Sequence, residues 1–496
     1  MKLSVDRKIF CWLLLWSAVV LMLMSPDSPI HGVWNRCDSA WFFMGGKAMM
    51  NGLRPYVDFC DSKGPLLWFI YGIGYLLSPR SYTGVWVLTV FFYAGIFYYN
   101  FKTARIFLKD NRRSLMATLL MAVPYFIYWF HYEIRAEDFC TLPVAVSLYY
   151  LFHLLYAKDE PQHSIRLTGL VLGGCFMALF LIKYNIAVMQ AFMILVALYY
   201  YVRETDKFWE PMKWLSAGAF AVALPFVLYL LLMGVFDAFF TEYLFKTFLT
   251  KHGSEYAFSV DVENAMYDPP IFSLFIMIVF GGWLIGRKLP RYRYVPLLTV
   301  IVFFVLSSYR CCFIYYYVTC LIFMLFIFVV ILQNASLSVS KRSLGVAVLI
   351  VLAWCVYENS HPKSMLYKSA IWTESDSREV YQDVARLFST VPHPRIINLF
   401  SNEQGLGIEA EPLPAGKYWS NQWGATEEMV REHVDLLKSG VADFVVIFVE
   451  GSLYEHGMTW DDLESYGYRK CYSREYGHFN SGVGITTVVC SKKHDN

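Results

Sequence analysis

The sequence predicts a polytopic α-helical membrane protein of about eleven transmembrane helices, followed by a small C-terminal extramembrane α/β domain. The chain has 496 residues, of which 57% are hydrophobic and 18% aromatic, and its mean hydropathy is +0.41. Soluble enzymes of this size are rarely so apolar. Long apolar runs fill residues 1–357, and the hydropathy falls to that of a soluble domain in residues 358–496. The net charge of +2 argues against nucleic acid as a partner.

Eleven charge-free apolar runs are candidates for membrane spans, because about 20 residues cross a bilayer and flanking aromatic or basic side chains extend shorter runs. The runs are 9–24, 81–101, 114–132, 139–157, 167–182, 184–202, 214–236, 269–286, 294–309, 311–332 and 343–357. The first run has no small-residue cleavage site and is expected to remain as a signal anchor. The run 65–77 has only 13 residues, which favours an interfacial or re-entrant helix over a span.

Basic residues set the predicted orientation of these spans. With eleven spans and an internal N-terminus, the basic loops 102–113 and 287–293 lie on the inner side, as the positive-inside rule requires. The outer loops are then 25–80, 133–138 and 237–268, and the C-terminal tail lies on the same side. We therefore expect a multi-pass protein of a bacterial inner or cell membrane, with its active site and C-terminal domain extracytoplasmic.

The C-terminal segment has the alternating pattern of a small α/β domain. Helices are predicted at 377–390 and 426–439, and buried strands at 395–400, 443–449 and 484–490. The Gly- and Pro-rich stretch 401–425 is expected to be a long, functional loop. Two disulfides, Cys37–Cys60 and Cys471–Cys490, are conceivable in an oxidising compartment, although sequence does not fix the connectivity.

The first outer loop carries the densest group of candidate functional residues. Asp38 opens a short aromatic-rich helix that Gly52 ends, so Asp38 is expected to cap the helix N-terminus. A helix N-terminus keeps a carboxylate ionised, which suits a base or an electrostatic anchor. Asp61 and Lys63 follow shortly afterwards, just before Pro65. Charged residues this dense beside apolar spans indicate chemistry at a membrane surface.

A second charged group lies where one span ends and the next begins. Glu133, Arg135, Glu137 and Asp138 alternate with apolar residues in a very short connection on the same predicted side as Asp38. A solvated loop of mixed charge is the simplest reading. The alternative is that Glu133 or Asp138 grips an acceptor and takes its proton.

Two single cations interrupt apolar hairpins and predict an anion site. Lys183 and Arg310 each separate two spans and reach the outer face, where basic residues are otherwise depleted. They either snorkel to the interface or join Lys63 and Arg135 in a pocket for a lipid phosphate. The neighbouring run 315–317 of three tyrosines is expected to be an interfacial aromatic belt.

Metal and nucleotide chemistry receive little support. The sequence has no Gly-rich phosphate loop and no zinc motif of the CxxC…CxxC or HExxH type. Asp38 and Asp138 could hold a divalent cation with water, but no acid pair has clear ligand spacing. We therefore assign no metal ligands and predict no cofactor firmly.

The order of these features resembles the GT-C superfamily of membrane glycosyltransferases, which includes protein O-mannosyltransferases and the aminoarabinose transferases of lipid A. The likeness covers nearly the whole chain and is sharpest in D-S-A-W-F, beginning at Asp38, and in G-L-R-P-Y-V-D-F-C-D-S-K-G-P, which ends at Pro65. Members typically show an acid, a short helix, a turn with Gly and Tyr, and then an acid and Lys before Pro. Ser62 and Gly64 depart from the usual acid–Lys–Pro run.

The resemblance implies a function and roles for individual residues. Such enzymes transfer a sugar, with inversion, from a polyprenyl-phosphate carrier to an acceptor on the outer side of the membrane. By this likeness Asp38 is the catalytic acid of the first loop, and Lys63 contacts the carrier phosphate with Asp61 beside it. Asp138 or Glu133 matches the acid of the second loop. The expected partners are the lipid-linked sugar, membrane lipids, and a glycan, lipid or protein acceptor.

Two other classes of protein remain open. A transporter or flippase of lipid-linked sugars would have many spans and intramembrane charge, but it usually shows internal repeats and interrupted helices. We find no repeat at a fixed period. A non-catalytic protein of envelope assembly is the third reading, and it predicts no loss of turnover when Asp38 is replaced.

Overall fold

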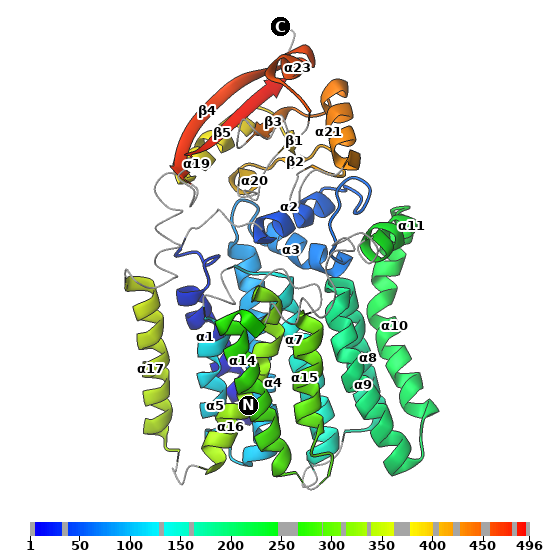
Figure 1. Ribbon diagram of the computed structural model, residues 1–496, viewed down its shortest axis with the longest axis vertical. Coiled ribbons are helices and arrows are strands. Elements are labelled where there is room, and N and C mark those ends of the chain that lie inside the picture. Colours follow the sequence, from blue (N-terminus) through cyan, green and yellow to red (C-terminus); the bar gives the residue numbers. More distant parts are fainter. Residues whose placement is uncertain are drawn as a thin grey trace. The chain divides into compact units, whose positions relative to one another are not determined.

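The computed structural model describes most of the 496-residue chain, and the ribbon is drawn in Figure 1. The described residues are 5–31, 38–127, 133–157, 163–246, 266–289, 291–308, 314–334, 339–361, 377–399, 406–419, 427–447, 457–478 and 484–492.

Within these residues, nine helices are long and apolar enough to cross a membrane. They are α1 (Val5–Met24), α4 (Thr83–Leu108), α7 (Ala136–Tyr156), α8 (Ile165–Ile182), α9 (Tyr184–Thr205), α10 (Trp209–Leu232), α14 (Pro269–Arg287), the continuous pair η2 (Ile314–Phe323) and α16 (Met324–Asn334), and α17 (Lys341–Ser360). The protein is therefore an integral multi-pass membrane protein, as predicted. A helix satisfies its own backbone hydrogen bonds, which is what a spanning segment needs in lipid.

In the other two predicted spans, the described residues form helices that are shorter than a bilayer crossing. Residues 294–308 contain α15 (Val295–Ser308), and residues 111–127 contain α5 (Asn111–Leu120) and α6 (Ala122–Tyr125), while 128–132 lie outside the described residues. Pro124 explains the break, because it has no backbone N–H to donate to the carbonyl of Leu120, four residues earlier.

The chain folds as two compact units. The first unit contains residues 1–25, 89–229 and 250–366, and the second contains residues 26–88, 230–249 and 367–496. Residues 26–88 and the segment after α10 thus belong with the C-terminal residues. The predicted domain division at residue 358 stays a prediction, but the second unit is larger than the predicted C-terminal domain.

Two short helices between α1 and α4 pack closely in the second unit. Helix α2 (Asp38–Met50) begins at Asp38 as predicted and ends before Gly52, whose φ of +81° is a left-handed conformation that favours glycine. Helix α3 (Pro65–Leu77) has 13 residues and is not among the candidate spans. A Cβ at Gly46 would lie 2.5 Å from the backbone nitrogen of Gly72, so glycine permits this close approach of α2 and α3.

The C-terminal part of the second unit is a five-stranded mixed sheet flanked by helices (Figure 1). The strand order is β2-β1-β3-β5-β4, in which β1 pairs in parallel with β2 and β3, and β5 pairs antiparallel with β3 and β4. The strands are β1 (Arg395–Asn398), β2 (Leu413–Pro414), β3 (Phe444–Ile447), β4 (Tyr468–His478) and β5 (Gly484–Lys492). The helices are α19 (Ser377–Phe388), α20 (Leu406–Glu409), α21 (Glu427–Ser439) and α23 (Trp460–Ser465).

This sheet confirms the three predicted strands and two predicted helices and adds β2 and β4, which the sequence did not predict. Strand β4 is a polar edge strand paired only with β5, so it lacks the apolar run of a buried strand. The proposed Cys471–Cys490 disulfide is wrong, because both thiols are free. Lys470 lies opposite Cys490 and Tyr472 opposite Val489, so Cys471 falls at the irregularity between them. Cys37 lies outside the described residues.

Candidate functional site

The first-loop group of the second unit is organised around the start of α2. The Asp38 side chain is buried, and so is every residue of α2 from Asp38 to Ala48. The Lys63 ammonium lies 3.7 Å from Oδ2 of Asp61 and 5.3 Å from the centre of the Phe42 ring. Phe42 lies one helical turn after Asp38 on the same face of α2. Lys63 is therefore held next to the helix face that carries Asp38.

The turn between α2 and α3 fixes the backbone at Lys63. Tyr56 has φ of +69°, a strained conformation for a residue other than glycine, and its N–H donates to the Phe59 carbonyl at 2.7 Å. Its buried hydroxyl donates to the Lys63 carbonyl at 2.8 Å. Burial, and then the neighbouring Tyr243, raises the pKa of Tyr56 well above its ordinary value, so it stays a neutral donor. Strain of this kind persists where it holds a functional residue in place.

The second-loop cluster of the first unit consists of Glu133, Arg135, Glu137, Asp138 and Lys183. Arg135 and Glu133 form a buried ion pair, in which Nε donates to Oε1 at 2.8 Å. The Arg135 guanidinium also lies 3.5 Å from the centre of the Tyr315 ring. A cation over a ring face is attracted by the ring quadrupole, and more strongly where water is excluded.

Lys183 is arranged like Arg135, but it lies over the next tyrosine of η2 (Ile314–Phe323). It ends α8, forms an ion pair with buried Glu137, and lies 4.0 Å from the centre of the Tyr316 ring. Two consecutive tyrosines of η2, Tyr315 and Tyr316, thus each contact one cation of the cluster through the ring face. Their polar environment is more specific than the aromatic belt that the sequence suggested.

Asp138 is committed to hydrogen bonds at the start of α7. Its Oδ1 accepts from the Tyr93 hydroxyl of α4 at 2.6 Å, and its Oδ2 accepts from the backbone N–H of Arg135 at 2.8 Å. The second bond is the helix-capping contact that satisfies a donor at an N-terminus. Asp138 therefore connects α4 to the loop that carries Arg135.

The structure brings four of the predicted site residues together in the first unit: Glu133, Arg135, Asp138 and Lys183. It brings Asp61 and Lys63 together beside α2 in the second unit. Arg310 lies outside the described residues. The convergence of both groups into one pocket stays a prediction. Sequence reasoning missed Tyr93, because nothing marks one tyrosine within the aromatic run of α4.

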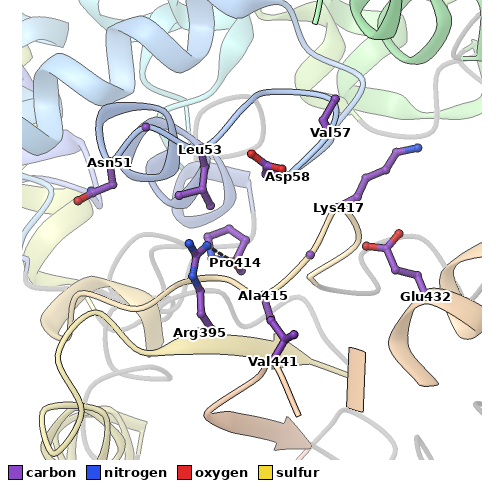
Figure 2. A pocket seen from close by; sticks show the side chains of 12 residues that line it. Asn51, Leu53, Val57, Asp58, Arg395, Pro414, Ala415, Lys417, Glu432 and Val441 are labelled. Atoms are coloured by element: carbon purple, nitrogen blue, oxygen red, sulfur yellow. Dashed lines mark hydrogen bonds between the residues drawn. The ribbon is translucent and has the colours of Figure 1, made fainter. Parts of the chain in front are cut away.

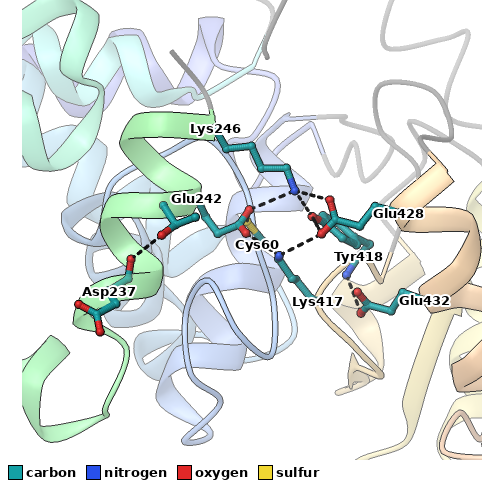
Figure 3. A network of polar contacts seen from close by, with 9 residues as sticks. Cys60, Asp237, Glu242, Lys246, Lys417, Tyr418, Glu428 and Glu432 are labelled. Carbon is teal, nitrogen blue, oxygen red and sulfur yellow. Dashed lines mark hydrogen bonds and ion pairs between the residues drawn. The ribbon is translucent and has the colours of Figure 1, made fainter. Parts of the chain in front are cut away.

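A third polar group, the Glu242 network, lies in the second unit and was also missed. Figure 3 shows Glu242 and Lys246 of η1 (Phe239–Lys246) facing Lys417 and Glu428. Glu242 contacts Lys417 at 2.6 Å and Lys246 at 3.4 Å, and Lys246 contacts Glu428 at 2.6 Å. Burial alone would lower the pKa of Lys417, but hydrogen bonds to Glu242 and Tyr418 raise it. These pairs keep the segment after α10 attached to the C-terminal residues of this unit.

The first loop is attached to the same place. The Cys60 N–H donates to the Lys417 carbonyl at 3.1 Å, and the Trp41 and Trp419 rings stack with centres 4.7 Å apart. Within the described part of the chain, no group of three or more His, Cys, Asp or Glu residues is placed to hold a metal ion.

Comparison with known proteins gives a match in structure only. No family model matches the sequence, and no curated protein does. The chain is similar to ArnT from Cupriavidus metallidurans bound to undecaprenyl phosphate, with 14% identity, a TM-score of 0.55 and 97% of each chain covered. The apo state of the same protein gives 13% identity and a TM-score of 0.58, covering 96% of this chain and 98% of that one.

A third match is weaker. The archaeal oligosaccharyltransferase AglB from Archaeoglobus fulgidus, in complex with an inhibitory peptide and a dolichol-phosphate, has 14% identity, a TM-score of 0.45, and coverage of 97% of this chain and 74% of its own. At this TM-score it carries no argument. The match shows that the chain shares the fold of ArnT, and a fold of this GT-C-like kind is what the sequence resemblance predicted.

Proposed function

We propose that this protein is an integral membrane glycosyltransferase that moves a sugar from a polyprenyl-phosphate carrier to an extracytoplasmic acceptor, with inversion. The observation that carries the proposal is the GT-C fold, shared along 97% of the chain with a protein that binds undecaprenyl phosphate. The buried acid at the start of α2, with Lys63 beside that helix, supports it.

Asp38 is the proposed base. It takes the proton of the acceptor hydroxyl while the hydroxyl oxygen bonds to the anomeric carbon of the sugar. The bond from that carbon to the carrier phosphate oxygen breaks, and the carrier phosphate leaves with the electron pair. Attack opposite the leaving group inverts the anomeric centre.

Lys63 is the first proposed contact to the carrier phosphate, because its ammonium lies beside the helix face that carries Asp38, at 5.3 Å from the centre of the Phe42 ring. Cations at this point neutralise the charge that develops on the leaving group. Arg135, Lys183 and Arg310 are the further proposed contacts. Since Arg135 and Lys183 already pair with carboxylates, a phosphate there would have to replace those contacts.

Glu133 and Asp138 then act as positioning residues rather than as the base. Glu133 holds the Arg135 guanidinium, and both oxygens of Asp138 accept hydrogen bonds. Hydrogen bonds from two donors stabilise a carboxylate in its ionised form, which makes it a weaker base. We therefore assign proton transfer to Asp38 and the alignment of the second loop to Asp138.

The proposed orientation places the N-terminus inside and both the first outer loop and the C-terminus outside. Its basis is the basic composition of 102–113 and 287–293. Reporter fusions after residues 108, 290 and 496 test it directly. An internal signal after residue 496 contradicts the orientation and the catalytic assignment together.

Activity is tested with purified protein in liposomes and a panel of undecaprenyl-phosphate-linked radiolabelled sugars, each incubated with an envelope extract as the source of acceptor. Transfer releases undecaprenyl phosphate and moves the label to a new species. Asp38→Asn keeps the size of the side chain but removes its charge, and transfer should fall by about 10²-fold or more.

The matched control is Asp206→Asn. Asp206 is exposed on a connection between spans and has φ of +54°, a conformation that asparagine tolerates. This variant should transfer at the wild-type rate. Normal transfer by Asp38→Asn would leave Asp38 as a helix cap only. Movement of the labelled donor across the bilayer without transfer would instead indicate a flippase.

A further inference from the structure

A polar cavity of about 490 Å³ lies in the second unit. Neither Asp38 nor Lys63 is among the residues that line it. This volume is within the range of small-molecule sites, roughly 300–1,000 Å³. Figure 2 shows Val57 and Asp58 of the first loop on one side and Arg395, Ala415 and Val441 on the other. The cavity is thus formed by the G-L-R-P-Y-V-D turn and the C-terminal sheet.

The charged groups of this cavity are compensated within the protein. Asp58 accepts two hydrogen bonds from the Arg54 side chain, at 3.0 and 3.1 Å. Lys417 pairs with Glu242 at 2.6 Å, and one Arg395 nitrogen, Nη1, donates to the Pro414 carbonyl at 2.8 Å. The charged residues of the lining are two acids and two bases, namely Asp58, Glu432, Arg395 and Lys417. Their charges balance, so the cavity does not select a charged ligand.

The remaining hydrogen-bonding capacity is mixed. Arg395 has further N–H donors, and Asp58 and Glu432 have acceptor lone pairs, whereas the Asn51 amide already donates to the Lys47 carbonyl at 2.9 Å. Burial raises the pKa of Glu432, against the hydrogen bonds from the Tyr418 and Lys417 backbone, so its carboxyl can also donate when protonated. Such alternating donors and acceptors match hydroxyl groups, which both donate and accept.

The apolar part of the lining fits the same ligand. Leu53, Val57, Pro414, Ala415 and Val441 supply aliphatic surface between the polar groups. A saccharide presents hydroxyl groups at its edge and C–H groups on its ring faces, so it complements both kinds of surface. A phosphate or a carboxylate would meet acids and paired bases instead.

We propose that this cavity binds an uncharged, hydroxyl-rich saccharide, which is part of the acceptor. The assignment to the acceptor rests on the proposed transferase function, whereas saccharide binding does not require it. The connection to the transfer site is the turn itself, because Val57 and Asp58 line the cavity while the adjacent Tyr56 hydroxyl holds the Lys63 carbonyl. Binding of the acceptor would therefore steady the residue proposed to contact the carrier phosphate.

The test is binding of the full-length detergent-solubilised protein to an array of uncharged hexose, N-acetylhexosamine and deoxyhexose oligomers, with phosphorylated and carboxylated counterparts and a polar peptide. We expect retention on a subset of uncharged saccharides. Ala415→Phe fills the cavity, and Asp58→Asn changes its polar edge at constant size. Each should weaken that retention at least tenfold, the loss expected for one good hydrogen bond or its steric equivalent.

Arg431→Ala is the matched control, because Arg431 is a solvent-exposed residue of α21 that does not line the cavity, and it should bind as the wild type does. Size-exclusion profiles show whether each variant is folded. If Ala415→Phe does not fold, saccharide binding by Asp58→Asn alone tests the inference. The inference is overturned if no arrayed saccharide is retained, if both cavity variants bind normally, or if only anionic saccharides or the peptide are retained.

Asp38→Asn separates this inference from the proposed function. It should abolish transfer but retain saccharide binding. Saccharide binding without any transfer by the wild type would refute the transferase proposal alone. If the wild type transfers sugar but Ala415→Phe and Asp58→Asn bind saccharide normally, only the present inference is refuted.

Discussion

Two charged clusters, one in each unit, differ in how far they are buried. In the second-loop cluster of the first unit, Glu133, Arg135 and Glu137 are at most 4% exposed, and each forms an ion pair. In the Glu242 network of the second unit, Lys246 is 33% and Glu428 54% exposed at the side chain. Both groups hold separate segments together, but only the first has excluded most water.

This difference changes what each ion pair is worth. Taking two charges out of water costs several kcal/mol per ion, and their attraction offsets this only with good geometry and further contacts. The tyrosine rings over Arg135 and Lys183 are such contacts. Exposed pairs cost little to form and stabilise little, typically about 0–1 kcal/mol. A buried cluster that is costly to maintain is a stronger candidate for function than an exposed one.

The largest expected effect comes from breaking the buried pair on one side. Arg135→Met leaves the Glu133 carboxylate buried without its partner, and should lower the free energy of unfolding by about 3–5 kcal/mol. Glu133→Gln combined with Arg135→Met should recover most of that loss. Thermal and denaturant unfolding in detergent micelles measures both. Equal stability of the single and double variants would mean that the pair is hydrated.

Lys47 extends the comparison to a fully buried cation of the second unit. Its ammonium donates to the Ala410 carbonyl at 3.3 Å, and burial lowers its pKa from 10.5 to about 7 despite the opposing charge of Glu411. Between those two values the unfolded chain binds the proton and the folded protein does not, so wild-type stability rises with pH. Lys47→Met should therefore stabilise the protein most at acidic pH.

The expected gain from Lys47→Met falls by roughly 2–3 kcal/mol between pH 6 and pH 9. Melting temperatures in detergent at both pH values measure it. Lys438→Met, at an exposed position of α21, is the control and should show little change at either pH. A gain that is constant with pH would mean that Lys47 remains charged in the folded protein.

A smaller effect separates the centre of the Glu242 network from its edge. Glu242 is 10% exposed and contacts two lysines, so Glu242→Gln should cost about 1–3 kcal/mol. Glu428→Gln should cost less than about 1 kcal/mol, and this cost should shrink further in high salt. The same unfolding assays at low and high ionic strength compare them, and equal costs would contradict the ranking.

The smallest effect is the acid sensitivity of Glu428. The hydrogen bond from Lys246 lowers the pKa of Glu428 below its ordinary 4.5. The contribution of Glu428 to the free energy of unfolding is therefore present above pH 4.5. It is lost as the pH falls through the lower pKa that Glu428 has in the folded protein. Wild type and Glu428→Gln should differ slightly at pH 7 and converge as the pH falls below the lowered pKa of Glu428. A difference that persists in acid would point to a structural role of the side chain other than charge.

The sequence by itself determined the features that depend on neighbouring residues. Apolar run length predicted the spans, because a segment in lipid needs side chains that tolerate hydrocarbon and must pair its own backbone groups. Asp38 and Gly52 predicted where α2 begins and ends, and Gly52 does so for a local reason, since its left-handed conformation favours glycine. The candidate charged residues were also visible, since charge within an apolar chain is conspicuous.

Only the tertiary structure decided what those charged residues do. Lys183 pairs with Glu137, 46 positions earlier, and Glu242 with Lys417, 175 positions later. The sequence predicted the cations as phosphate contacts but not their carboxylate or tyrosine partners. It also missed polar β4, which is a strand through its pairing with β5 rather than through its own hydrophobicity. The free energy of an ion pair or a strand pairing depends on which distant groups meet and on how much water they exclude. Neither can be predicted from the order of residues along the chain.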